Sequence, residues 1–221
     1  MLGSGACCSA SAAVAREHHL GMDHGVRYEI EDPRHGLGDP DAEAIWQLLR
    51  AADEEFVPPL SARGSTVQPE LEPQPSAKQR GPGEPGTGQG PARYFDELRG
   101  QHFILARERR TDHVVGFLSY REHHLLPEGA PGGEHLYVST VIVDPAHRRQ
   151  GITRAMYERL DAEAARCGQG IATRTWSGNT GHLRLLQELG VREVLRLPDH
   201  RGPGEDTHYL ARGPRTTGDG R

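Results

Sequence analysis

The stretch His135–Trp176 constrains the fold of this chain more than any other part. It opens with HLYVSTVIVD, a run dense in β-branched residues, which predicts a strand. A turn rich in arginine and glycine follows at Arg148–Gly151, and Gln150–Arg166 then has the apolar spacing of a helix. Gly168 closes that helix, and IATRTW predicts the next strand. Strands and helices that alternate in this way indicate an α/β (α+β) domain.

Shorter patterns on both sides predict further elements. Strands are expected at 26–30, 102–108, 113–122, 191–197 and 206–212, and helices at 39–56, 94–100 and 179–190. In the first of these helices we expect Asp39 to be the cap and Pro40 to take the first helical position. One face of that helix carries Ile45, Leu48, Leu49, Ala52 and Phe56.

The length of 221 residues suits one domain with disordered flanks. We expect residues 1–21 to be a disordered extension, 22–212 a single domain and 213–221 a disordered tail. Within the domain, 12 of the 33 residues in 61–93 are proline or glycine, and large apolar residues are almost absent there. Such a segment cannot bury enough surface to offset its chain entropy, so we predict a flexible insertion.

Composition also excludes several classes of protein. The net charge of −5 gives no electrostatic case for nucleic acid. Three cysteines, without a CxxC pair, predict neither a disulfide framework nor a zinc or other metal site, which fits a reducing compartment such as the cytoplasm. No apolar run of about 18 residues occurs, so we expect no membrane span.

The turn after the predicted strand has the properties of an anion site. Unpaired backbone N–H groups and the helix dipole place partial positive charge there, and Gly151 lets an anion approach the backbone. Arg148, Arg149 and Arg154 add positive potential. These features predict a cradle for phosphate or pyrophosphate, and the alternative is a solvated basic surface. The Walker A and dinucleotide fingerprints GxxxxGK[ST] and GxGxxG are both absent.

The segment VIVDPAHRRQGITRAM resembles the acetyl-CoA signature of the GCN5-related N-acetyltransferase (GNAT) superfamily, R/Q-x-x-G-x-G/A after a strand that ends V-x-P. Arg148 and Gly151 match that signature, and Thr153 stands where Gly or Ala is usual. NTGHLRLLQELGV resembles the later family motif, an Asn followed by a helix that ends Leu-Gly-Phe. The resemblance implies a mixed, mostly antiparallel central sheet of about six to seven strands, splayed at a central parallel pair and flanked by about four helices.

The resemblance also implies acetyl-CoA as co-substrate and residues that bind it. The pyrophosphate would lie on the backbone of the turn and the first helical residues, with Arg148 beside it, over Arg149, Gln150, Gly151, Ile152, Thr153 and Arg154. The pantetheine would pair like an added strand with Val141, Ile142 and Val143. Asn179 matches an Asn that contacts the cofactor arm, and the alternative role is a helix cap.

The implied reaction is direct attack of a primary amine on the thioester, and the amine must first lose a proton. By strand alternation, His135, Tyr137, Ser139 and Val141 are expected to share one face, which makes Tyr137 and Ser139 candidate catalytic residues. The usual acid, a Tyr on the late helix, is Leu186 in this chain, so His182 one turn earlier becomes the candidate. For each candidate, plain packing is the alternative, and the thiolate can also leave unaided.

The acceptor is implied only as a small-molecule or peptide amine. Trp176 and the last hairpin, with Arg201, Asp206 and His208, are expected to border its cleft. The acidic net charge favours a cationic acceptor. A homodimer remains open, and the alternative to an enzyme is a non-catalytic acyl-CoA-binding or regulatory module.

Overall fold

The structure, a computed structural model, describes residues 27–63, 65–66, 90–130 and 132–214. Its strands are β1 (Tyr28–Ile30), β2 (Arg34–His35), β3 (His102–Glu108), β4 (Val114–His124), β5 (His135–Val143), β6 (Gly170–Trp176), β7 (Arg192–Leu197) and β8 (Thr207–Arg212). Its α-helices are α1 (Asp39–Ala52), α2 (Ala92–Leu98), α3 (Ile152–Cys167) and α4 (Thr180–Glu188). The predicted extension 1–21 and most of the predicted insertion and tail lie outside the described residues.

A single sheet runs through the described part of the chain in the order β1–β3–β4–β5–β6–β8–β7, with β2 also paired to β3. The β5–β6 pair is parallel, and the other neighbouring pairs are antiparallel. This confirms the predicted mixed, mostly antiparallel sheet. The sequence did not predict β2, because two residues are too few to show an alternating pattern.

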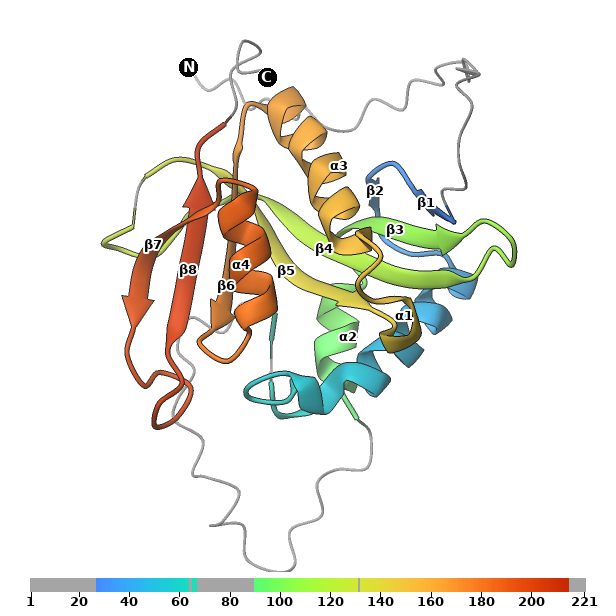
Figure 1. The fold of residues 1–221 in the computed structure, drawn as a ribbon, viewed down its shortest axis with the longest axis horizontal. Helices are drawn as coiled ribbons and strands as arrows, with labels where there is room; N and C mark the ends of the chain where they lie inside the picture. Colours follow the sequence, from blue (N-terminus) through green and yellow to red (C-terminus); the bar gives the residue numbers. More distant parts are fainter. Residues whose placement is uncertain (1–26, 64, 67–89, 131, 215–221) are drawn as a thin grey trace, which may run out of the picture.

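Helices cover both faces of the sheet (Figure 1). On one face α3 and α4 pack their apolar sides on a core that includes Met156, Leu160 and Leu186, all of them fully buried. On the other face α1 and α2 enclose a second core around Ile45 and Leu49. Burying a large aliphatic side chain contributes about 1.5–3 kcal/mol, so these two cores fix the helices to the sheet.

Two helix starts differ from the sequence-based expectation. The cap of α1 is Gly38, and Asp39 is the first helical residue, without a capping hydrogen bond from its side chain. The second start is that of α3, which begins at Ile152 because Gly151 has a left-handed backbone with φ of +79°. Such a residue ends the preceding turn and cannot belong to a right-handed helix.

The predicted insertion is partly built into the fold. A one-turn 3-10 helix covers Leu60–Ala62, and Arg63 and Thr66 that follow are buried. Thr66 hydrogen-bonds through its backbone N–H to Glu97 Oε2 at 2.9 Å, which ties this segment to α2. Residues 67–89 lie outside the described part of the chain.

The parallel pair opens towards its carboxyl end. β5 and β6 are in register from His135–Gly170 to Val138–Thr173. Beyond that point β5 continues beside β4, and β6 continues beside β8. This opening, called the β5–β6 gap below, is the splay that the family resemblance implies.

A β-bulge in β5 changes which side chains share a face. Ser119 pairs with Thr140, but Tyr120 pairs with Val138, so Ser139 is the extra residue. Val138 and Val141 consequently pack on the α3/α4 side, whereas Tyr137 packs with Ala172 on the other side. The expectation that His135, Tyr137, Ser139 and Val141 lie on one face is therefore wrong, because strict alternation ends at the bulge.

Candidate functional site

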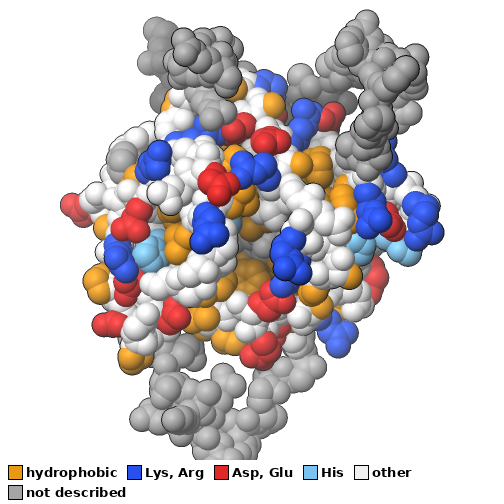
Figure 2. All heavy atoms as spheres, in the orientation of Figure 1, with side chains coloured by type: hydrophobic (Ala, Val, Ile, Leu, Met, Phe, Trp, Pro, Cys, Tyr) orange, Lys and Arg blue, Asp and Glu red, His pale blue; other side chains and the backbone are white. Residues whose placement is uncertain are grey.

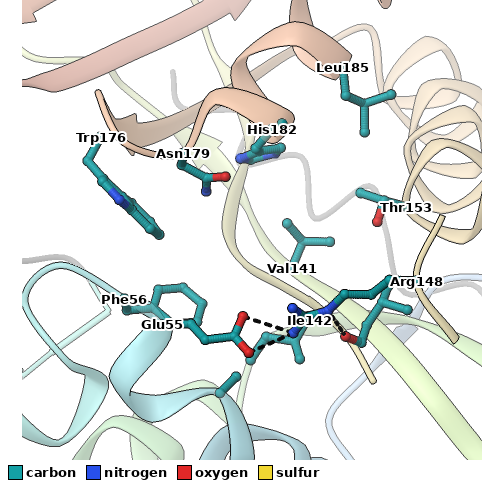
Figure 3. A pocket seen from close by; sticks show the side chains of 13 residues that line it. Glu55, Phe56, Val141, Ile142, Arg148, Thr153, Trp176, Asn179, His182 and Leu185 are labelled. Atoms are coloured by element: carbon teal, nitrogen blue, oxygen red, sulfur yellow. Dashed lines mark hydrogen bonds and ion pairs between the residues drawn. The ribbon is translucent and has the colours of Figure 1, made fainter. Parts of the chain in front are cut away.

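A cavity of 420 Å³ passes through the β5–β6 gap. Figure 3 shows that its walls come from the end of α1, the edge of β5, the start of α3, the start of α4 and Trp176. A second cavity of 210 Å³ lies against the turn before α3. The two cavities share Val143, Arg148, Thr153 and Leu185 as lining residues, so they form one continuous groove. The face drawn in Figure 2 is hollowed near its centre, with hydrophobic side chains at the bottom.

The turn before α3 presents backbone N–H groups to the second cavity. The first α-helical hydrogen bond runs from the Ala155 N–H to the Gly151 carbonyl at 3.0 Å, so the N–H groups of Ile152, Thr153 and Arg154 precede the helical ladder. A Cβ atom placed on Gly151 would meet no atom within 4 Å. Open space in front of unpaired N–H groups at a helix N-terminus is suited to an anion.

The side chains of Arg148 and Arg154 are occupied by the protein itself, whereas Arg149 is exposed and lines the second cavity. Arg148 Nε donates to the Val143 carbonyl at 2.9 Å, and Arg148 Nη2 donates to both carboxylate oxygens of Glu55 at 2.8 Å (Figure 3). The Arg154 guanidinium forms an ion pair with Glu188. Arg148 therefore braces the end of β5 against the segment after α1, and the backbone N–H groups of the turn stay open towards the second cavity.

The neighbouring side chains of the turn divide between core and groove. Gln150 accepts a hydrogen bond from the Tyr28 hydroxyl at 2.8 Å, and Ile152 is buried in the core. Ile152 can therefore meet a ligand in the groove only through its backbone. Thr153, in contrast, lines both cavities, so the residue that departs from the family signature borders the groove directly.

The edge of β5 offers backbone groups to the gap. The Asp144 N–H donates to the Val115 carbonyl at 2.9 Å, which makes Val115–Asp144 a hydrogen-bonded pair with β4. In an antiparallel ladder such pairs alternate with pairs whose backbone groups point outward. By this alternation Val141 and Val143 direct their N–H and C=O groups away from β4, into the gap.

His182 borders the cavity from α4 (Figure 3) and has a tyrosine partner behind it on α3. Its Nε2 shares a 2.9 Å hydrogen bond with the hydroxyl of Tyr157 on α3. Burial lowers the pKa of His182 to about 4, so the imidazole is neutral at pH 7. Burial likewise raises the pKa of the Tyr157 phenol, which keeps its proton.

Tyr157 lies where the two strands separate. Its hydroxyl hydrogen-bonds to Thr173, and the Thr173 hydroxyl donates to the Val138 carbonyl at 3.1 Å. Thr173 and Val138 are the last paired residues of β5 and β6. Sequence reasoning missed Tyr157 because it falls on the apolar face of a helix, where its spacing predicts only core packing.

The other two catalytic candidates lie elsewhere. Tyr137 is buried on the α1/α2 side of the sheet, its ring centroid 4.2 Å from that of His124, and burial raises the pKa of its phenol. Ser139 occupies the bulge, and its buried Oγ has no hydrogen-bond partner among the described residues. The structure therefore does not bring Tyr137 and His182 together on one face.

Two further residues of the late helix bear on alternatives left open by the sequence. Asn179 stands at the cap position of α4 but makes no capping hydrogen bond, and its side chain lines the cavity (Figure 3). Leu186 is fully buried in the core, so its position does not face the groove.

The last hairpin meets the wall of the cavity at Trp176. Arg201 places its guanidinium over the ring of Trp176, with Cζ 5.6 Å from the ring centroid. The Trp176 ring also lies 5.7 Å from that of Phe56, which follows α1 and which the sequence analysis did not single out for the site. His208 and Asp206 point elsewhere: His208 bonds Glu193 at 2.6 Å, and Asp206 bonds Arg196 at 2.7 Å.

Comparison with known proteins agrees with this geometry. The sequence profile of the Acetyltransferase (GNAT) family matches residues 71–191, more than half of the chain. The chain belongs to the acetyltransferase (GNAT) family. Acetyl-CoA is the co-substrate of acetyl transfer in this family. A search of curated proteins found no match.

Solved GNAT structures resemble the whole domain. A putative GNAT acetyltransferase from Desulfovibrio desulfuricans is 16% identical, with a TM-score of 0.55 over 85% of this chain and 100% of that one. A putative acetyltransferase from Salmonella typhimurium, solved with its cofactor acetyl-CoA, is 16% identical, with a TM-score of 0.54 over 88% and 98%. The ribosomal-protein-S18-alanine N-acetyltransferase from Escherichia coli is 16% identical, with a TM-score of 0.51 over 88% and 98%. At these identities the similarity shows the GNAT fold.

Among the helices of the described residues, none combines the length and the apolar character that crossing a membrane requires.

Proposed function

We propose that this GNAT protein transfers the acetyl group of acetyl-CoA to a primary amine of a small-molecule or peptide acceptor. The observation that carries the proposal is the continuous groove from the turn before α3 through the β5–β6 gap. One end offers N–H groups suited to a pyrophosphate, and the middle offers a strand edge suited to the amides of a pantetheine arm. The residues present therefore fit acetyl-CoA.

The proposed contacts to the co-substrate follow the groove. The N–H groups from Arg149 to Arg154 would hold the pyrophosphate. The N–H and C=O of Val141 and the N–H of Val143 would pair with the pantetheine, since the Val143 carbonyl already accepts a hydrogen bond from Arg148. Ile142 contributes to the wall of the first cavity, and Asn179 points into it, where its amide can bond the arm. Arg148 would act mainly as the brace between β5 and Glu55.

His182 and Tyr157 are the groups that we assign to the leaving thiolate. In the reaction the amine nitrogen forms a bond to the carbonyl carbon, the carbon–sulfur bond breaks, and the amine proton passes to solvent. The thiolate then needs a proton. Both groups are neutral and weakly acidic, so the pair would relay a proton from water to the thiolate through the hydrogen bond between His182 Nε2 and the Tyr157 hydroxyl, without ionising itself.

Tyr137 is a poor candidate for the base, since burial raises the pKa of its phenol and it stays protonated at neutral pH. On the α1/α2 side it can instead form part of the wall of the acceptor site. We leave deprotonation of the amine to water in the gap.

A non-catalytic acyl-CoA-binding module is the alternative, favoured by one observation: the position of the usual acid is Leu186, which is buried in the core. Release of free CoA with a panel of primary amines, together with mass spectrometry of the products, separates the two. The enzyme reading predicts an acetylated amine and stoichiometric CoA. Tight acetyl-CoA binding without turnover of any amine would favour the binding module.

The variant His182→Gln tests the assignment of the acid. We expect kcat to fall about 100-fold or more, with unchanged affinity for acetyl-CoA by calorimetry. The matched control is His113→Gln, since His113 lies at the β3–β4 turn, away from the gap. An unchanged kcat in His182→Gln would remove His182 from the mechanism while leaving acetyl transfer intact.

A further inference from the structure

Four arginines meet on the α1/α2 side of the sheet, beyond the ring of Trp176. Each comes from a different part of the chain: one follows the one-turn helix Leu60–Ala62, one lies on β4, one on β6 and one in the β7–β8 loop. They are Arg63, Arg121, Arg174 and Arg201, called the arginine cluster below.

Two members of the cluster flank the aromatic wall of the cavity. Arg63 Nη2 and Arg201 Nη1 both donate to the carbonyl of Val57, the first at 3.3 Å. The Cζ of Arg63 lies 5.2 Å from the ring centroid of Phe56, while the Cζ of Arg201 lies over Trp176. Phe56 and Trp176 line the cavity in the gap, so the two guanidinium groups stand directly behind its wall.

The other two members extend the positive charge along the sheet. Arg121 pairs in register with Tyr137, and its Cζ lies 5.2 Å from the Tyr137 ring centroid. Its Nε and Nη2 are buried and have no hydrogen-bond partner among the described residues. Arg174 lies two residues before Trp176 on β6, hence on the same face, and hydrogen-bonds to Tyr209.

The charges of three members of the cluster are poorly balanced, whereas burial of Arg174 is outweighed by Tyr137 and Tyr209, which raise its pKa. Burial, followed by the like charges of Arg63 and Arg174, lowers the pKa of Arg201 to about 9. Burial also lowers the pKa of Arg63 and of Arg121. Glu97 is the carboxylate that acts on Arg121, and it already accepts hydrogen bonds from the N–H and hydroxyl of Thr66 at 2.9 and 2.5 Å. Buried cations without matching anions are unfavourable, and a bound anion would relieve that.

We propose that the acceptor is a small amine that also carries an anionic oxygen group, a carboxylate or a phosphonate, bound by the arginine cluster. The proposal rests on the proposed function, since it names the class of acceptor for the same gap. The anionic group would lie against Arg121 and Arg201, and the amine would reach past Trp176 and Phe56 towards the gap. Guanidinium groups bind such oxygens in a bidentate manner, so they would orient the amine as well as hold it.

This inference departs from the cationic acceptor that the net charge of −5 favours. Net charge averages over the whole surface, whereas a ligand responds to the charges within a Debye length of about 10 Å. Glu55 is the acidic residue that lines the cavity, and it is paired with Arg148, whereas Arg63 and Arg201 stand behind the aromatic wall without such a partner among the described residues.

The test compares matched pairs of amines, each an amino acid or aminophosphonate and its uncharged amide or ester. Acetylated product and free CoA are measured with saturating acetyl-CoA. We expect kcat/KM to be about tenfold or more higher for the anionic member of the preferred pair. The amides have more weakly basic amines and hence more neutral amine at pH 7, which biases the comparison against the proposal. An equal or higher kcat/KM for the uncharged members would overturn it while leaving acetyl transfer in place.

The variants Arg201→Gln and Arg121→Gln test the cluster directly. Each should raise KM for the anionic acceptor about 10-fold to 100-fold and reduce the discrimination within the pair, with unchanged acetyl-CoA affinity. Arg110→Gln is the control, because Arg110 is a highly exposed arginine on the β3–β4 turn. Arg121→Gln is the variant expected to stay folded if Arg201→Gln does not. The buried nitrogens Nε and Nη2 of Arg121 have no hydrogen-bond partner among the described residues, so the substitution breaks no hydrogen bond of theirs. Unchanged discrimination in both folded variants would overturn the proposal.

Failure of the proposed function is distinguishable from failure of this inference. If acetyl-CoA binds but no amine is acetylated, the binding of the same pairs of amines to the protein–CoA complex is measured by calorimetric titration in place of turnover. Binding of the anionic members alone, lost in Arg201→Gln and Arg121→Gln, would still support the cluster. Equal binding of both members, or no binding of either, would overturn it.

Discussion

Gly151→Glu is the substitution that the structure makes most informative. The new side chain would start from a residue with φ of +79° and point into open space in front of the N–H groups of α3. The left-handed backbone costs a non-glycine residue about 1–2 kcal/mol, so the domain should fold with a lower melting temperature. A carboxylate at about 4 Å from a pyrophosphate charge is unfavourable by about 1 kcal/mol in water and about 4 kcal/mol at an effective dielectric of 20. Affinity for acetyl-CoA should therefore fall about 5-fold to 1000-fold.

The other end of the same helix provides a matched control. Gly168 has φ of +66°, and a Cβ there would also meet no atom within 4 Å. Gly168→Glu thus repeats the strain and the added charge without approaching the groove. Gly151→Ala and Gly168→Ala separate strain from charge.

Calorimetric titration with acetyl-CoA gives the affinity of each variant, and thermal unfolding gives its melting temperature. We expect Gly168→Glu and Gly168→Ala to keep the wild-type affinity and Gly151→Ala to lose less than Gly151→Glu. Wild-type affinity in a folded Gly151→Glu protein would refute the placement of the pyrophosphate at this turn.

Three further predictions follow from single contacts. If Arg148 acts as a brace, Arg148→Gln and Glu55→Gln should both weaken acetyl-CoA binding a few-fold in calorimetric titrations. Each variant should lose at most about 1 kcal/mol of stability. If the Arg148 charge instead binds acetyl-CoA directly, Glu55→Gln should bind it more tightly. The fold lowers the pKa of His182 from 6.5 to about 4, so the unfolded state binds the proton first as pH falls. Between pH 7 and pH 5, the free energy of unfolding of the wild type, measured in urea, should therefore fall by about 2 kcal/mol more than that of His182→Gln. Leu186→Tyr should lower the free energy of unfolding by about 1–3 kcal/mol in the same assay, because residue 186 faces the core. For the same reason it should not raise kcat, and a rise in kcat would contradict the placement of residue 186 in the core.

Local patterns in the sequence were enough to predict most of the framework. The β-branched run of β5, the glycine before α3 and the apolar face of α1 depend on neighbours within a few residues, so they can be read directly from the chain. The bulge at Ser139 could not be predicted in this way. It arises from the register between β4 and β5, which depends on packing between segments distant in the sequence.

The same distinction separates the two parts of the site. The turn that we propose to bind the pyrophosphate is contiguous, and the sequence located it together with its family signature. The partners of that turn are not contiguous: Arg148 meets Glu55 across 93 residues, and Tyr157 meets His182 across 25. Arg63 was hidden in a proline- and glycine-rich segment that predicted only flexibility. Its burial depends on contacts with Val57, Pro58 and Phe56 that only the folded chain forms.

The most direct test of the account is amide hydrogen exchange, measured by NMR with and without saturating acetyl-CoA. The account places the co-substrate along the edge of β5 and on the start of α3. It therefore predicts slower exchange at the amides of Val141 and Val143 and at those of Ile152, Thr153 and Arg154, with little change in β1 and β3. A protein saturated with acetyl-CoA whose exchange is unchanged at both of these segments would contradict the account.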